Sequence, residues 1–189
     1  MIDHHKNLRV YLPNIFYLKK MHAILKKNLI ILGGVKMDFE KKLEELGFVL
    51  PVATKPLGSY VPYKIVGNMI HLSGQGPFID GRSIYSGKVG GAVSQDQGYE
   101  AARVCALNLL AQLKAAVGSL DNIKQIISVK GYVASESDFT GHPSVINGAS
   151  DLLVNVFGES GKHVRCALGA NVLPVDIPVE IEMVAELKD

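Results

Sequence analysis

Residues 94–118 hold the feature that most constrains the fold, an amphipathic helix marked at both ends. Ser94 and Gln97 have the spacing of a capping box, which satisfies two free N–H groups at a helix start. Gly118 is the residue type at which helices most often stop. Between them, apolar residues recur three and four positions apart, at Ala102, Cys105, Ala106, Leu109, Leu113, Ala116 and Val117. Because one face of this helix is apolar along its length, it must pack against a second layer.

Two further helices and five strands are expected around it. A second long helix begins near Pro143, whose ring suits the first helical position, and ends at Gly158. A short helix covers 38–46, and strands are expected over 61–66, 69–73, 126–134, 164–172 and 178–187. Gly67-Asn68 joins the first two strands into a hairpin whose turn needs a positive φ. The glycine-rich residues 74–93 predict a long loop with room for a short strand.

This order of elements indicates the fold class. It runs helix, hairpin, helix, strand, helix and two strands, so the two long helices share one face of a mixed sheet in a two-layer α+β sandwich. The composition, 48% hydrophobic and 20% charged, is that of an ordinary globular protein. Residues 37–189 are long enough to bury one core, and we expect them to form a single domain.

The formal net charge of +2 conceals two oppositely charged segments. Residues 1–36 carry seven Lys and Arg side chains against Asp3 alone, whereas residues 37–189 carry 13 basic and 17 acidic side chains. Nucleic-acid binders usually carry their basic charge on the folded domain. Residues 37–189 carry more acidic than basic side chains, so nucleic acid is disfavoured as a partner.

The first 36 residues have no helical or alternating period. A basic arm is one interpretation. The other is that Gly33-Gly34, encodable as a bacterial ribosome-binding sequence, lies just upstream of the true start at Met37. We favour the second interpretation. In this hypothesis residues 1–36 are a translated leader that forms no domain.

Compartment and cofactor signals are few. Cys105 and Cys166 form no disulfide framework, no apolar run reaches the roughly 20 residues of a membrane span, and no secretory signal pattern is present. We therefore expect a cytoplasmic protein. Phosphate-binding, dinucleotide-binding, zinc-protease and serine-hydrolase motifs are all missing, and His71, His142 and His163 lack metal-ligand spacing. No metal or cofactor is expected, and each histidine alone is interpreted as a surface or hydrogen-bonded residue.

Arg165 stands out because it interrupts an otherwise apolar strand. A guanidinium in that position either extends to the edge of the sheet or binds a carboxylate with two hydrogen bonds. Glu180 and Glu182 share one face of the last strand and are its candidate partners. An ordinary cross-strand Arg–Glu pair on a solvated face remains the alternative. Cys166 falls on the opposite strand face from Arg165, and we interpret it as a packing residue.

Several segments of residues 37–189 stand out together: Gly58-Ser59-Tyr60-Val61-Pro62, the run from Val66 to Gln75, Ser137-Asp138-Phe139, Leu173-Pro174 and Val179-Glu180-Ile181-Glu182. With Arg165, these segments resemble one family, the RidA/YjgF (reactive intermediate imine deaminase, liver perchloric-acid-soluble protein) family. The spacing from Arg165 to Glu180 matches the family pattern without a gap. The glycine-rich loop and residues 157–163 resemble a longer subgroup of the family.

The resemblance implies a chorismate-mutase-like sandwich assembled as a homotrimer with clefts between subunits. It implies hydrolysis of enamine and imine intermediates, such as 2-iminopropanoate, to 2-oxo acids and ammonia, without a cofactor. The expected partners are therefore small 2-imino and 2-oxo acids and further copies of the chain, and the expected role is metabolite damage control.

The resemblance also assigns roles to individual residues. Arg165 matches the arginine that binds the substrate carboxylate, and Glu180 matches the glutamate that activates water. Five other residues match positions that line the cleft or bind the ligand: Tyr60, Ser73, Gly74, Asn147 and Ala167. The sequence departs from the family's common Arg-Ser-Cys at Arg165-Cys166-Ala167, where Ala167 keeps a backbone carbonyl but no thiol.

Two other functions stay open. A non-catalytic protein that binds small carboxylates would need Arg165 but not Glu180. An endoribonuclease or translation inhibitor, an activity attached to the family name, would need a basic surface, which the acidic residues 37–189 do not favour.

Overall fold

A computed structural model describes residues 38–56 and 58–189. Within this part of the chain the first element is α2 (Phe39–Glu45), where the Asp38 carboxylate accepts a hydrogen bond of 2.8 Å from the backbone N–H of Lys41. Gly47 follows with φ of +81°, in the left-handed region expected after a helix end. The expected leader, residues 1–36, and the start at Met37 lie outside the described residues.

The two long helices begin and end close to the expected residues. In α3 (Gln95–Val117) the capping box is present, since Ser94 Oγ accepts from the N–H of Gln97 and Gln97 Oε1 accepts from the N–H of Ser94. Helix α4 (His142–Phe157) has a proline in its first turn and ends at Gly158. These ends were predictable because caps are local interactions between neighbouring residues.

Five strands form one mixed sheet in the order β1-β2-β7-β5-β6. The strands are β1 (Tyr63–Val66), β2 (Met69–Gln75), β5 (Ile123–Ala134), β6 (Val164–Ala170) and β7 (Val179–Leu187). β5 and β6 are parallel, and the other neighbours are antiparallel. Gly67 has φ of +59° in the turn between β1 and β2, which confirms the expected hairpin.

Several predicted details of the strands were wrong. β1 begins at Tyr63 rather than 61, and β2 continues to Gln75 rather than ending at 73. β5 begins at Ile123 rather than 126, directly after the 3-10 turn η1 (Leu120–Asn122), because its first residues pair with the end of β7. β6 ends at Ala170 rather than 172. The glycine-rich loop holds two short paired strands instead of one, β3 (Phe78–Ile79) and β4 (Arg82–Ser83).

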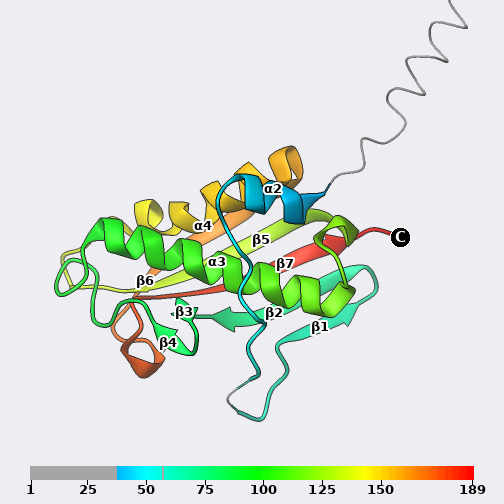
Figure 1. Ribbon diagram of the computed structural model, residues 1–189. Coiled ribbons are helices and arrows are strands. Elements are labelled where there is room, and N and C mark those ends of the chain that lie inside the picture. The colour runs from blue at the N-terminus through cyan, green and yellow to red at the C-terminus, as the bar shows by residue number, and fades with distance from the viewer. Residues whose placement is uncertain (1–37, 57) are drawn as a thin grey trace, which may run out of the picture. The chain divides into compact units, whose positions relative to one another are not determined.

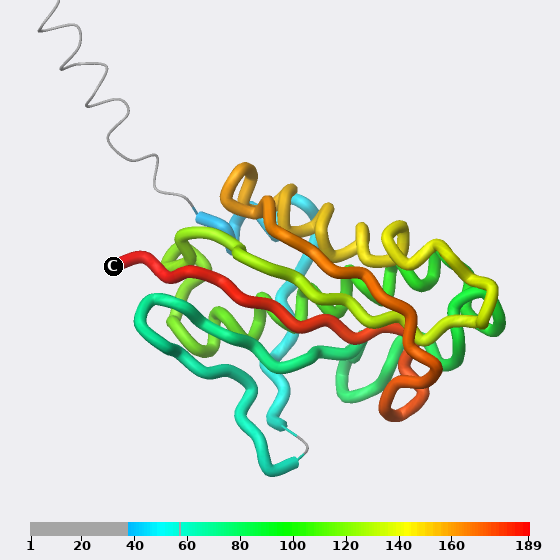
Figure 2. The backbone as a smooth tube through the Cα atoms, turned by 180° about the vertical axis from the view of Figure 1, so that it is seen from behind, coloured from blue at the N-terminus to red at the C-terminus, as the bar shows by residue number. Residues whose placement is uncertain are grey.

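Asp38–Asp189 form one unit with two layers. Helices α2, α3 and α4 lie on the same side of the sheet (Figure 1). From behind, no helix of residues 38–56 and 58–189 crosses in front of the strands, so these residues leave the second face of the sheet uncovered (Figure 2). The α+β sandwich with two long helices on one face is therefore confirmed. No helix in residues 38–56 and 58–189 is long and apolar enough to cross a membrane.

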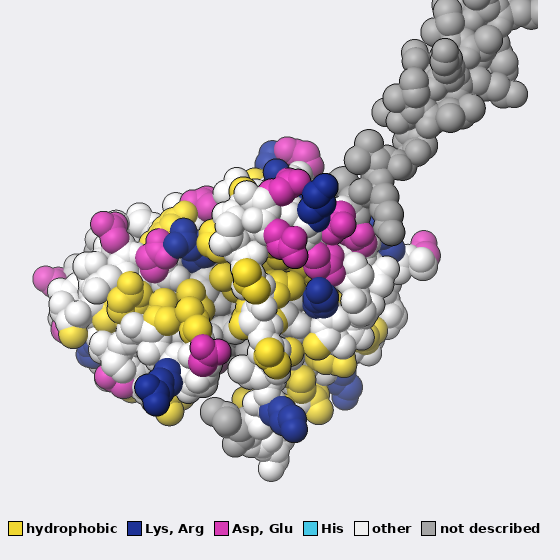
Figure 3. Space-filling view, in the orientation of Figure 1, with side chains coloured by type: hydrophobic (Ala, Val, Ile, Leu, Met, Phe, Trp, Pro, Cys, Tyr) yellow, Lys and Arg dark blue, Asp and Glu magenta, His cyan; other side chains and the backbone are white. Residues whose placement is uncertain are grey.

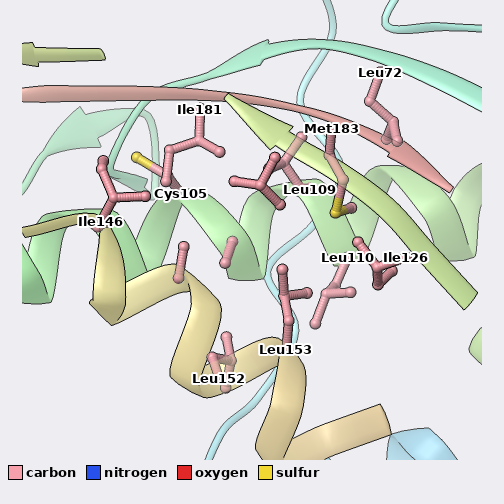
Figure 4. Packing of buried hydrophobic residues seen from close by; sticks show 14 of the residues in the cluster. Leu72, Cys105, Leu109, Leu110, Ile126, Ile146, Leu152, Leu153, Ile181 and Met183 are labelled. Atoms are coloured by element: carbon pink, nitrogen blue, oxygen red, sulfur yellow. The ribbon is translucent and has the colours of Figure 1, made fainter. Parts of the chain in front are cut away.

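The core lies between the two layers. Leu109 and Leu110 of α3 and Leu153 of α4 point toward Ile181 and Met183 of β7 (Figure 4). All five side chains are at most 1% exposed. The alternate residues of β7 are partly exposed and turn to the opposite face, so this strand gives only one of its faces to the core.

Candidate functional site

The expected site residues lie on two faces of the sheet. Arg165 pairs in register with Val129, which is fully buried under the helices, so the arginine belongs to the helix-covered face. Glu180 pairs in register with Tyr132 and lies on the uncovered face. A cross-strand Arg165–Glu180 pair is therefore wrong for a single chain, because the two side chains point away from each other.

Arg165 is held by the neighbouring helix. Its Nη1 donates to Asn147 Oδ1 at 2.7 Å and to Ser150 Oγ at 3.0 Å, both from α4. These two bonds use both hydrogens of Nη1. The Nε and Nη2 hydrogens have no partner among the described residues. They form the planar edge that binds a carboxylate with two parallel hydrogen bonds.

A histidine extends this network. His163 Nδ1 lies 2.7 Å from the carbonyl oxygen of Gly161, and its Nε2 lies 3.0 Å from Ser150 Oγ. Burial is the largest cause that lowers the pKa of His163, and the positive charge of Arg165 lowers it further, against the opposing effect of the Gly161 hydrogen bond. These contacts agree with the expectation that His163 is a surface or hydrogen-bonded residue, but the sequence did not connect it with Arg165, and Ser150 was not among the expected site residues.

Ala167 and Cys166 separate as the strand period predicts. Ala167, two residues after Arg165, lies on the helix-covered face and packs partly against the core. Cys166 lies on the uncovered face and is exposed, so its interpretation as a packing residue was wrong for this chain. Asn147, Arg165 and Ala167 thus form one group, along the edge made by α4 and β6.

The second group gathers where β2 changes register against β7. Leu72 pairs with Met183 and Gln75 with Ile181, so three steps on β2 oppose two on β7, which is a β-bulge at Ser73 and Gly74. The Glu180 carboxylate lies directly against the Cα of Gly74, in the space that any side chain at residue 74 would fill. Ser73 Oγ donates to the carbonyl of Val61 at 2.7 Å and so fixes the loop before β1.

Two neighbouring carboxylates on this face have different surroundings. Glu182 accepts from the Tyr132 hydroxyl at 2.8 Å and pairs with Lys130 at 3.2 Å. Glu180 has no hydrogen bond or ion pair with any described residue. Burial, and then the negative charge of Glu182, raise the pKa of Glu180 above its usual value. A carboxyl group whose pKa is raised by burial and by a like charge is a candidate for an acid–base role.

A pocket of about 160 Å³ adjoins Gly74. Its lining residues are Thr54, Lys55, Pro56, Tyr60, Pro62, Gly74, Gln75, Gly76, Phe78 and Gly81. Helix α3 fixes two of its walls. Buried Asn108 donates at 3.0 Å to the carbonyls of Gly76 and Phe78, and Gln112 donates at 2.7 Å to the carbonyl of Thr54. Tyr60, Ser73, Gly74 and Glu180 are therefore brought together on this side.

In residues 38–56 and 58–189, no three His, Cys, Asp or Glu side chains converge in a way that could hold a metal ion. The chemistry available on the described surface is that of a guanidinium edge, an unpaired carboxylate and hydrogen-bonding groups of the pocket.

Known proteins share this two-layer α+β sandwich with its mixed five-stranded sheet. Residues 40–187 match the family model described as "YjgF/chorismate mutase-like, putative endoribonuclease". Protein TCP17 of Trypanosoma cruzi is 40% identical over 148 residues, which cover 78% of this chain and 92% of that protein. The chain therefore belongs to the YjgF/chorismate-mutase-like family, also called RidA.

Solved structures agree with this assignment. A protein of unknown function from Agrobacterium tumefaciens is 42% identical, with a TM-score of 0.74, and the match covers 79% of this chain and 94% of that one. E. coli TdcF, solved with bound serine, is 21% identical with a TM-score of 0.54, covering 72% and 94% of the two chains. The second likeness shows the fold alone.

Proposed function

We propose that the protein is an imine and enamine deaminase, which hydrolyses 2-imino acids of the 2-iminopropanoate type to 2-oxo acids and ammonia. One observation carries the proposal: the chain has both a pre-positioned guanidinium edge, on Arg165, and a half-buried carboxylate without a partner among the described residues, on Glu180. The first suits the carboxylate of an imino acid, and the second suits the activation of water.

The proposed reaction needs few steps. The Nε and Nη2 of Arg165 hold the substrate carboxylate. Glu180 accepts a proton from a water molecule as its oxygen bonds to the imine carbon, and the C=N electron pair moves to nitrogen. Glu180 returns this proton to nitrogen, which gives a carbinolamine. Transfer of the hydroxyl proton to the same nitrogen, again through Glu180, then breaks the C–N bond and releases ammonia as the carbon–oxygen double bond forms. An imine is already electrophilic, so positioning and one base suffice.

The site is proposed to lie between subunits of a homotrimer. Arg165, Asn147 and Ala167 lie on one side of the chain, whereas Glu180, Gly74, Ser73 and Tyr60 lie on another. We call the free Nε–Nη2 side of the guanidinium the Arg165 edge, and the surface formed by Glu180 and Gly74 the Glu180 wall. A head-to-tail ring would bring the Arg165 edge of one subunit to the Glu180 wall of the next. The uncovered sheet face with its exposed apolar side chains, including Val164 and Leu168, supports burial in such a ring.

The remaining parts of the proposal concern ligand and location. Serine, which TdcF binds, carries the carboxylate and the nitrogen that a 2-imino acid also presents. We propose small 2-imino and 2-oxo acids as ligands, no cofactor, and a cytoplasmic role in metabolite damage control.

Two alternatives make different demands on the surface. A carboxylate-binding protein without catalysis would use the same Arg165 edge and would not need Glu180. An endoribonuclease would need a basic surface. On the helix-covered side, acidic side chains gather around α2 and basic ones are scattered among them (Figure 3), which does not favour RNA.

The deciding experiment couples a serine or threonine dehydratase to this protein and follows decay of the released imine. Wild type should accelerate the decay, and Arg165→Ala should lose roughly 100-fold in kcat/KM because two charge-assisted hydrogen bonds disappear. Glu180→Ala should lose about 100-fold or more in kcat, as expected for a general base. Lys42→Ala, which removes an exposed positive charge on α2, is the matched control.

No acceleration by wild type, together with tight binding of a 2-oxo acid, would favour the carboxylate-binding protein. A wild-type rate in Arg165→Ala would remove Arg165 from the site. Cleavage of RNA by wild type that is unaffected by both substitutions would favour the endoribonuclease.

A further inference from the structure

The hydrogen bonds around Arg165 have a direction that the atoms themselves determine. A carbonyl oxygen only accepts, so the bond between Gly161 and His163 places the proton on Nδ1. In the neutral imidazole Nε2 is then an acceptor, and the Ser150 hydroxyl donates to it. With its hydrogen committed, Ser150 Oγ presents only lone pairs to Nη1 of Arg165.

The charged groups around His163 leave this arrangement undisturbed. Asp151 of α4 accepts a hydrogen bond from Tyr99 of α3, and Glu159 at the following 3-10 turn pairs with Lys162. β5 sets Ser128 and Val129, which carry no charge, beside this end of β6. Arg165 itself is the charge that acts on the imidazole, and together with burial it favours the neutral ring.

We propose that Ser150 and His163 are positioning residues that hold the Arg165 guanidinium with its Nε–Nη2 edge turned outward for a carboxylate. The inference rests on the proposed function of Arg165 and adds two residues to it. Asn147 and Ser150 together fix both hydrogens of Nη1, so the plane of the guanidinium cannot turn about its long axis. The ligand then meets an ordered donor pair and does not have to order it.

Protonation of His163 would disturb the network. The charged ring donates from Nε2, so two cations, His163 and Arg165, would converge on the one oxygen of Ser150. The Ser150 hydrogen would also lose its acceptor. Carboxylate binding should therefore weaken as the pH falls through the pKa of His163.

The test measures binding of pyruvate, the 2-oxo acid product, by calorimetry, together with KM and kcat in the coupled imine assay. Ser150→Ala should raise the pyruvate Kd and KM about fivefold to tenfold and leave kcat within about twofold, because the guanidinium loses one of the two acceptors that order it and keeps Asn147. Ser144→Ala, an exposed serine on the same helix, is the matched control and should behave as wild type.

Two substitutions of His163 separate the hydrogen bond from packing. His163→Leu keeps the bulk but removes the acceptor, and it should resemble Ser150→Ala. His163→Gln offers an amide oxygen to Ser150 and cannot be protonated, so it should keep the wild-type affinity and lose its decline at acid pH. Equal losses in the Leu and Gln variants would overturn the proposal.

Arg165→Ala distinguishes this inference from the proposed function. If Arg165→Ala loses pyruvate binding while Ser150→Ala and His163→Leu bind as wild type does, the positioning role is wrong and the carboxylate site stands. If Arg165→Ala itself binds pyruvate as wild type does, the proposed function of Arg165 fails. Should His163→Leu not fold, Ser150→Ala alone decides the question.

Discussion

The Arg165 edge and the Glu180 wall lie on opposite faces of one sheet and differ in how their side chains are held. Arg165 has its Nη1 bound twice by α4 and is ordered before any ligand arrives. Glu180 has no hydrogen-bond or ion-pair partner among the described residues and lies against Gly74, half-buried and beside Glu182. A group that anchors a ligand benefits from fixed geometry, whereas a base benefits from the absence of compensating bonds.

The difference also shows what each face of a strand can supply. The helix-covered face offers side chains from α4 that can hold a guanidinium in place. The uncovered face offers neighbouring strands only, so the surroundings of Glu180 come from a β-bulge and from Glu182. The proposed chemistry needs both groups, and the two do not meet within one chain.

Co-expressed Arg165→Ala and Glu180→Ala chains should recover activity that neither variant has alone. If each site takes its arginine and its glutamate from different subunits, random mixing in a ring restores both groups in roughly a quarter of the sites. The measurement is the coupled imine assay on the mixed assembly, with separately purified homo-oligomers as controls. Activity that stays at the level of the single variants would mean that the two halves do not meet between subunits.

Gly74→Ala tests the Glu180 wall without touching a charged group. A Cβ at residue 74 would enter the space of the Glu180 carboxylate and displace it, so kcat should fall roughly tenfold to 100-fold, as for a misplaced catalytic group. Pyruvate binding, which depends on Arg165, should change little. Gly58→Ala is the control, because a Cβ there meets only the Tyr60 ring at 3.5 Å. A wild-type kcat in Gly74→Ala would contradict the placement of Glu180 as the base.

The smallest expected effect concerns stability and pH. The pKa of Glu180 is raised in the folded protein above its ordinary value of 4.5, so ionisation is easier in the unfolded chain. Stability is therefore lost as pH rises from near 4.5 through the folded pKa, and Glu180→Gln should be more stable than wild type above that range and equal to it below. Because the carboxylate keeps part of its hydration, the gain should stay below about 1 kcal/mol.

The check is denaturant unfolding of both proteins between pH 4 and pH 8. Glu44→Gln, an exposed glutamate on α2, should show no such pH-dependent difference from wild type. A Glu180→Gln variant that is less stable than wild type at neutral pH would indicate that the carboxylate has a stabilising partner.

The elements that could be predicted are those whose signals lie within a few residues of each other. The capping box at Ser94 and Gln97, the end at Gly118 and the turn at Gly67 all appear where the sequence places them. The start of β5 could not be placed from local pattern, since its first residues become strand by pairing with β7 more than 60 residues away.

For the candidate site, the residue types and their spacing were readable, and part of the network was too. Ser150 follows Asn147 by three positions on a helix, and His163, directly before β6, precedes Arg165 by two positions in extended chain, so each pair shares a face. That spacing could have drawn attention to both residues. What it could not indicate is that the two faces meet, because α4 and β6 approach only in the folded chain.

By itself the sequence determined the helices, the hairpin, the α+β class and the two residues on which the proposed chemistry rests. These follow from periodicity, caps and family resemblance, which depend on neighbouring positions in the chain. Only the tertiary structure decided that Arg165 and Glu180 face away from each other, that a bulge at Gly74 admits the glutamate, and that Ser150 bonds both Arg165 and His163. The physical reason is that strand order and register, which set the neighbours of a side chain, arise from contacts between residues distant in sequence.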